Sequence, residues 1–185
     1  MVMHELPNHD PVTQITIVPR GQAGGMTISL PEEDRSYLSK SYMEEQIVSL
    51  LGGRVAEKLC LGDISTGASN DIQRATSIAR KMVASYGMSD KLGTVSFDDN
   101  SEVFIGRTMS QGRSYSEAVA AQIDEEVKAI VAEAYRRCEE ILTARRAELD
   151  TVAQYLLEHE TMEQEAFLAV FEPKEVSESR KCPVK

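Results

Sequence analysis

The sequence predicts a mainly α-helical protein with a small β-hairpin or sheet near its N-terminus and a long helical arm. Two observations lead to this fold class. β-branched and polar residues alternate only in two short stretches before residue 31. From about residue 36 onward, apolar residues recur at the three- and four-residue spacing of amphipathic helices, and one such stripe continues from residue 120 to residue 141.

The β element comprises residues 13–18 (TQITIV) and 26–30 (MTISL). A loop with three glycines, PRGQAGG, joins them, which is typical of a hairpin or of neighbouring strands. Pro31 ends the second strand. Because two strands alone are unstable in water, we expect them to pack against helices.

The first helix is predicted to begin at Ser41 and to close at Gly62. Ser41 and Glu44 have the spacing of a capping box. Gly52 and Gly53 lie inside this helix and cost it about 2 kcal/mol of propensity, so another group is expected to approach the backbone there. The apolar stripe of the helix is Ile47, Leu50, Leu51, Val55 and Leu59.

The second helix follows residues 65–71, which have the composition of a helix cap, and ends at Gly87. A long connection, 88–113, leads to a second capping box at Ser114 and Glu117. This box begins a helix over 114–142, the predicted arm. The stripe of the second helix is Ile72, Ala75, Ala79, Met82, Val83 and Tyr86, and that of the arm is Ala120, Ile123, Val127, Ile130, Ala134, Cys138 and Ile141.

Another helix carries Leu149, Val152, Ala153 and Leu156, and Thr161 with Gln164 is predicted to cap a last short helix. We expect one domain over residues 1–160, the short C-terminal helix over 161–172, and a disordered tail over 173–185, which has few apolar residues.

The charge of the chain argues against two classes of partner. The 185 residues include 20 Lys and Arg against 30 Asp and Glu, a formal net charge of −10. Nucleic-acid binding and docking on anionic membranes both need a basic face. The apolar runs are too short for a membrane span. Three widely spaced cysteines, Cys60, Cys138 and Cys182, indicate a reducing compartment.

One histidine pair and one His-Glu dipeptide imitate a zinc motif without matching it. His4 and His9 are five residues apart, whereas HExxH places its histidines four apart on one helix face, and Pro7 between them would break a helix. His159-Glu160 has no second histidine at the required spacing. We therefore interpret His4 and His9 as loop histidines.

Asp71, in the run Ser65-Thr66-Gly67-Ala68-Ser69-Asn70-Asp71, has two interpretations. It is either an acidic residue in the first turn of a helix, stabilised by the helix dipole, or a rigidly placed metal ligand. The residues by themselves leave both open.

Two segments carry a family resemblance. Residues 50–93 (LLGGRVAEKLCLGDISTGASNDIQRATSIARKMVASYGMSDKLG) and 7–35 (PNHDPVTQITIVPRGQAGGMTISLPEEDR) resemble the peptidase domain of the FtsH family, membrane-anchored ATP-dependent zinc metalloproteases. The resemblance covers about residues 1–160. It implies a Zn²⁺ ion held by the two histidines of an HEAGH helix and by the Asp of STGASND, which is Asp71 in this sequence.

The same resemblance suggests what the chain lacks. In the family, HEAGHA stands directly before the segment that matches Met1–Leu6. We therefore expect this chain to begin after the zinc helix, without the two histidines and the general-base Glu, and to be inactive alone as the C-terminal part of the domain. The alternative is a non-catalytic assembly or interaction fragment, or a pseudoprotease.

The resemblance also suggests roles for other residues. Glu57 is either a carboxylate near the metal that orients a histidine or a solvent-exposed helix residue. The strand bearing Thr13, Ile15 and Ile17 resembles the edge to which an extended substrate adds, with plain sheet packing as the alternative. The helix 114–142 resembles an arm that packs neighbouring subunits, although it could equally belong to the core.

For the intact protein, the resemblance implies polypeptide substrates and a homo-hexamer at the cytoplasmic face of the bacterial inner membrane. It also implies ATP and Mg²⁺ at an upstream ATPase module that is not in this chain. This segment itself is expected to be soluble and to make no membrane contact.

Overall fold

The computed structural model describes residues 1–19, 21, 24–31, 37–97 and 115–172. These residues form two compact units. Unit 1 contains residues 1–11 and 30–146, and unit 2 contains residues 12–29 and the chain from 147 onward. The prediction of a mainly helical fold with a small sheet and a long helix is confirmed. The predicted tail, 173–185, lies outside the described residues, and the predicted boundaries at 160 and 172 stay a prediction.

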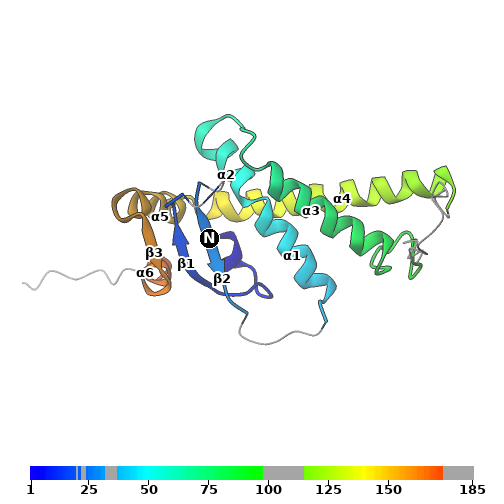
Figure 1. Cartoon of the computed structure of the whole chain (residues 1–185), viewed down its shortest axis with the longest axis horizontal. Helices are drawn as coiled ribbons and strands as arrows, with labels where there is room; N and C mark the ends of the chain where they lie inside the picture. Colours follow the sequence, from blue (N-terminus) through cyan, green and yellow to red (C-terminus); the bar gives the residue numbers. More distant parts are fainter. Residues whose placement is uncertain (20, 22–23, 32–36, 98–114, 173–185) are drawn as a thin grey trace, which may run out of the picture. The chain divides into compact units, whose positions relative to one another are not determined.

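Unit 1 consists of a short 3-10 helix, η1 (Val2–Glu5), and four helices: α1 (Lys40–Leu50), α2 (Gly52–Leu61), α3 (Ser69–Ala84) and α4 (Glu117–Ala144). Helices α1 and α3 lie side by side and pack against α4, which also contacts α2 and η1 (Figure 1). The apolar stripes predicted for these helices largely face this packing. The prediction is wrong for Tyr86, which lies beyond the end of α3 and is 53% exposed. Fully buried side chains of the unit include Ile47, Val48, Val55, Ala75, Ala79, Met82, Val83, Ile123 and Cys138.

The predicted first helix is divided in two at Leu51. Helix α1 ends before Leu51 and α2 begins at Gly52. A Cβ atom on Gly52 would lie 3.4 Å from the Cγ2 atom of Val2, whereas one on Gly53 would meet nothing within 4 Å. The expected close approach therefore exists at one glycine and not at the other. Gly62 ends α2 with φ of 70°, a conformation that favours glycine.

The predicted starts of α1 and α4 are wrong by a short distance. Ser39 caps α1, because its hydroxyl oxygen accepts a hydrogen bond from the backbone N–H of Tyr42 (3.1 Å), while Ser41 lies inside the helix. Ser116 caps α4 in the same way, and Ser114 lies outside the described residues. The cap depends on where the backbone becomes helical, and neighbouring serines satisfy the sequence pattern almost equally well.

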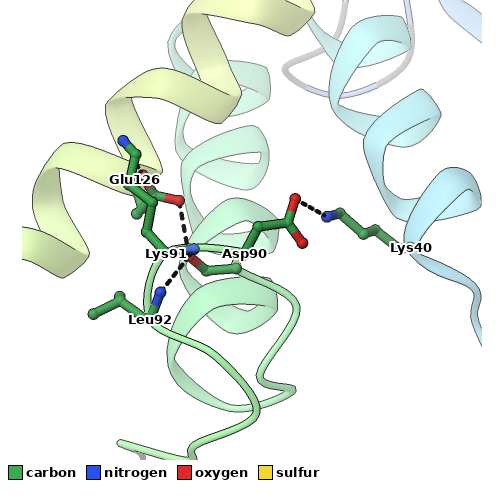
Figure 2. Close-up of polar contacts among 6 residues, drawn as sticks. Lys40, Asp90, Lys91, Leu92 and Glu126 are labelled. Atoms are coloured by element: carbon green, nitrogen blue, oxygen red, sulfur yellow. Dashed lines mark hydrogen bonds and ion pairs between the residues drawn. The ribbon is translucent and has the colours of Figure 1, made fainter.

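Residues 88–97, the described part of the long connection, are held against α4 by Ser89. Its hydroxyl donates to a carboxylate oxygen of Glu126 (2.8 Å) and accepts from the backbone N–H groups of Lys91 and Leu92 (3.2 Å each). The Lys91 ammonium pairs with the other oxygen of Glu126 at 2.6 Å (Figure 2). These contacts raise the pKa of Lys91 and lower that of Glu126.

Unit 2 contains β1 (Val12–Thr16), β2 (Met26–Ser29), β3 (Thr161–Glu163), most of α5 (Arg146–His159) and α6 (Gln164–Ala169). The strands form an antiparallel sheet in the order β2-β1-β3. The prediction that Thr161 caps a helix is therefore wrong. Thr161 belongs to β3 and α6 begins after Glu163.

The sequence predicts that the apolar runs are too short for a membrane span, and the structure tests this for helices. Across the described ranges, none of the helices combines the length and the apolar character that crossing a membrane requires.

Candidate metal-binding site

The candidate site lies where α2 ends and α3 begins. Gly62 turns the chain out of α2, and its N–H donates to the carbonyl of Lys58 (3.2 Å). The loop that follows closes onto α3 through two backbone hydrogen bonds, from Ser69 N–H to the Thr66 carbonyl and from Ile72 N–H to the Ala68 carbonyl, each 3.0 Å long. Because Ala68 is buried, the start of α3 has a defined position in unit 1.

Asp71 lies in the first turn of α3, as predicted. Its side chain is 44% exposed, and one carboxylate oxygen lies 3.8 Å from a guanidinium nitrogen of Arg74. An exposed ion pair of this length holds the carboxylate weakly. Asp71 is therefore accessible to a metal ion, and the helix dipole favours its negative charge.

Glu57 of α2 is directed at the loop before Asp71. One of its carboxylate oxygens accepts a hydrogen bond from the Ser65 hydroxyl (2.6 Å) and the other accepts one from the Ser65 N–H (3.2 Å). The Ser65 hydroxyl oxygen also accepts from the N–H of Gly67 (3.1 Å). The hydrogen bonds from Ser65 are the main reason that the pKa of Glu57 lies below its ordinary value.

Sequence reasoning missed Ser65 as an individual residue and treated the whole run 65–71 as a cap. Its signal was present, because a Ser followed two residues later by Gly is typical of a side-chain-stabilised turn. What the sequence did not show is that the partner of Ser65 is Glu57 on the preceding helix.

An open pocket of about 610 Å³ lies beside this loop. It is lined by Arg54 of α2, by Ile64, Ser65 and Thr66 of the loop, and by Ser69, Ile72 and Gln73 of α3. The loop that leads to Asp71 therefore borders solvent-accessible space.

The residues present fit a metal ion only in part. Asp71 offers one accessible oxygen ligand. Among the residues with described positions, no group of three His, Cys, Asp or Glu side chains is arranged to hold a metal. The imidazole nitrogens of His9 lie 3.1 Å from the Asp10 carbonyl and 3.1 Å from the Ser49 hydroxyl. Zinc sites use three or four protein ligands, so further ligands would have to come from elsewhere.

β1 is the central strand of the described sheet, so the prediction that it forms an edge is wrong, whereas a role of this sheet in binding substrate stays a prediction. Thr13, Ile15 and Ile17 belong to or adjoin the central strand, where Ile15 is opposite Thr27 of β2 on one side and Met162 of β3 on the other. The Ile17 N–H continues this pairing by donating to the carbonyl of Glu160 (2.9 Å). The outer strands of the described sheet are β2 and β3, because β3 occupies the side of β1 that the sequence left open.

The predicted arm, α4, supplies the core of unit 1. Its buried side chains are Ile123, Val127, Ala134, Cys138 and Leu142. The core interpretation of this helix is thus confirmed, and its role between subunits stays a prediction.

Comparison with known proteins places these observations in a family. The model of peptidase family M41 matches residues 1–170. The chain is 56% identical over 167 residues to the ATP-dependent zinc metalloprotease FtsH 2 of Alkaliphilus metalliredigens, covering 90% of this chain and 24% of that protein. It is 55% identical over 172 residues to FtsH 1 of Thermoanaerobacter sp., covering 92% of this chain and 28% of that protein. It is 48% identical over 162 residues to FtsH of Bacillus subtilis, covering 86% of this chain and 25% of that protein. The chain thus spans about a quarter of the length of these relatives.

Proposed function

The chain belongs to peptidase family M41, and from this premise we propose that it forms part of the zinc metallopeptidase domain of a membrane-anchored, ATP-dependent protease. The observation that carries the proposal is the position of Asp71. It is a half-exposed carboxylate in the first turn of α3, and it stands at the residue that the resemblance assigns to a zinc ligand.

Bound zinc would polarise the scissile carbonyl and lower the pKa of a water molecule. In this chain Asp71 would hold the ion as one ligand. The 185-residue sequence contains no HExxH motif. The two histidine ligands and the general-base Glu would therefore come from an HEAGH helix outside these residues, and we propose that the chain by itself does not cleave peptides.

For the intact protein, the proposal includes polypeptide substrates and a homo-hexamer to which α4 contributes. It also includes a location at the cytoplasmic face of the bacterial inner membrane, and an ATPase module, separate from this segment, that binds ATP and Mg²⁺. The names of the relatives support the ATP dependence and the zinc chemistry.

A segment exchange tests the proposal. This chain replaces the matching segment of Bacillus subtilis FtsH, with which it shares 48% identity. We expect the chimera to degrade unfolded casein with ATP and zinc, whereas the isolated 185-residue chain does not. Asp71→Asn in the chimera should reduce proteolysis by more than about 100-fold, beyond the loss typical of residues that only support a ligand, and should leave ATP hydrolysis unchanged.

Asp63→Asn is the matched control, because Asp63 lies in the same loop and accepts a hydrogen bond from the N–H of Ile64 (2.7 Å). It should retain both activities. Undiminished proteolysis by Asp71→Asn would refute the role of Asp71. A chimera that hydrolyses ATP and binds zinc but never cleaves casein would favour the non-catalytic alternative.

A further inference from the structure

We propose that Ser65 is a positioning residue for metal binding: Glu57 holds it, and it fixes the turn that carries Asp71 into α3. The inference rests on the proposed function, because Ser65 and Glu57 act on the metal only through Asp71. The contact with Ser65 adds a third interpretation of Glu57 to the two that the sequence left open, a solvent-exposed helix residue and a carboxylate that orients a histidine, and both of these stay predictions.

The first argument is the geometry of the contacts. Ser65 donates to both carboxylate oxygens of Glu57, from its hydroxyl at 2.6 Å and from its backbone N–H at 3.2 Å. A two-point contact fixes the orientation of the loop relative to α2, which a single hydrogen bond does not. Hydrogen bonds to an ionised carboxylate are also stronger than neutral ones.

The second argument is that the constraint continues toward Asp71. The Ser65 hydroxyl oxygen accepts the N–H of Gly67 at 3.1 Å, which closes a turn over residues 65–67. The next residue, Ala68, is buried and accepts the N–H of Ile72 in α3. The turn therefore joins directly to the first turn of the helix that bears Asp71.

The third argument is the space at Gly67. A Cβ atom there would lie 3.2 Å from the Ser65 hydroxyl oxygen and 3.7 Å from a carboxylate oxygen of Glu57. The first distance is tighter than ordinary contact. A side chain at Gly67 would push on the Ser65–Glu57 contact, so the turn is closely fitted against it.

Such a contact acts on metal affinity through preorganisation. A ligand that is already placed loses less conformational freedom when the metal binds. Removing groups that orient a ligand typically weakens metal affinity or activity by about 10–100-fold. We expect an effect in this range from Ser65→Ala, and a smaller one from Glu57→Gln, which keeps one acceptor oxygen.

The first measurement uses the full 185-residue chain. Amide hydrogen exchange followed by NMR should show faster exchange at Gly67 in Ser65→Ala than in the wild type. Ser65→Thr keeps the hydroxyl and should restore slow exchange. Thr66→Ala is the matched control, because the Thr66 hydroxyl makes no hydrogen bond within the part of the chain that the structure describes. It should leave exchange at Gly67 unchanged.

The second measurement uses the chimera, with zinc affinity determined by competition with a chelator. Ser65→Ala should weaken zinc binding about 10–100-fold, and its proteolysis should recover at high zinc, which a general folding defect would not. Ser65→Thr should bind zinc close to the wild-type level. If Ser65→Ala loses its helical circular dichroism, the zinc affinity of Glu57→Gln decides instead.

The outcomes separate this inference from the proposed function. If Asp71→Asn weakens zinc binding and the Ser65 and Glu57 variants do not, the positioning role is refuted and the proposed function stands. If Asp71→Asn itself binds zinc like the wild type, the proposed function fails. The expected result is weaker zinc binding in Ser65→Ala, with proteolysis that recovers at high zinc. Ser65→Thr should bind zinc close to the wild-type level.

Discussion

The carboxylate of Glu45 should be among the most important polar groups for the stability of unit 1. Glu45 lies on α1 and is only 2% exposed. One of its oxygens accepts the backbone N–H of Asn8 at 2.8 Å, and the other accepts the Asn8 side-chain amide at 3.0 Å and lies 3.4 Å from a guanidinium nitrogen of Arg137 on α4. A single carboxylate thus ties the N-terminal segment to two helices.

The expected cost of Glu45→Ala follows from these contacts. Each hydrogen bond to a charged group contributes about 1.5–3 kcal/mol, and removing one partner of a buried ion pair costs about 3–5 kcal/mol. The hydrogen-bond energy and the ion-pair energy describe partly the same contacts of Glu45, so they are not added. The Arg137 side chain is 40% exposed, so water compensates much of its loss. Asn8 is exposed as well, so water reaches its donors too. We therefore take the low end of the hydrogen-bond range for each of the two Asn8 contacts and expect Glu45→Ala to lower the free energy of unfolding by about 3 kcal/mol.

Glu45→Gln separates shape from charge. It fills the same space but turns one acceptor oxygen into a donor that faces Asn8. We expect a loss of about 2 kcal/mol, between the wild type and Glu45→Ala. Glu125→Ala on the exposed face of α4 is the control and should change stability by less than about 0.5 kcal/mol.

The assay is urea unfolding of the 185-residue chain, followed by circular dichroism at 222 nm, with the slope of the transition compared between variants. An unchanged slope shows that the denatured state is not the cause. If Glu45→Ala costs less than about 1 kcal/mol at constant slope, the Asn8 donors find another acceptor and the reasoning is wrong.

Two further predictions concern smaller contacts. Ser89→Ala should cost about 1–3 kcal/mol, because the buried hydroxyl donates to Glu126 and accepts from two backbone N–H groups. Urea unfolding measures this loss. Lys91→Ala removes only the exposed end of the ion pair and should be less destabilising than Ser89→Ala. The Ser65–Glu57 contact should depend on pH. Because the folded state holds the pKa of Glu57 below its ordinary value of 4.5, its contribution is present above that pH and is lost as the pH falls through the lower folded value. The stability difference between wild type and Glu57→Gln should therefore shrink below about pH 4.5, and a constant difference down to pH 2 would contradict this assignment.

Local patterns were enough to predict the helices and their buried faces. Ala75, Ala79, Met82 and Val83 on α3 were recognisable because the period of an α-helix repeats within a few residues. The end of α2 was equally local, since Gly62 alone adopts the left-handed conformation there. The same holds for Asp71 in the first turn of α3.

Other features depended on segments that meet only in the folded chain. β1 is a central strand because Met162, far along the sequence, pairs with Ile15, and a three-residue strand is too short to show its own period. Glu57 accepts hydrogen bonds from Ser65 because the loop after α2 folds back toward that helix. Glu45 meets Asn8 and Arg137 because the N-terminal segment and α4 pack against α1. Helical periodicity indicates which face of a helix is buried. Strand order and the pairing of polar groups depend instead on which distant surfaces meet, and a single sequence carries no local signal for such a meeting.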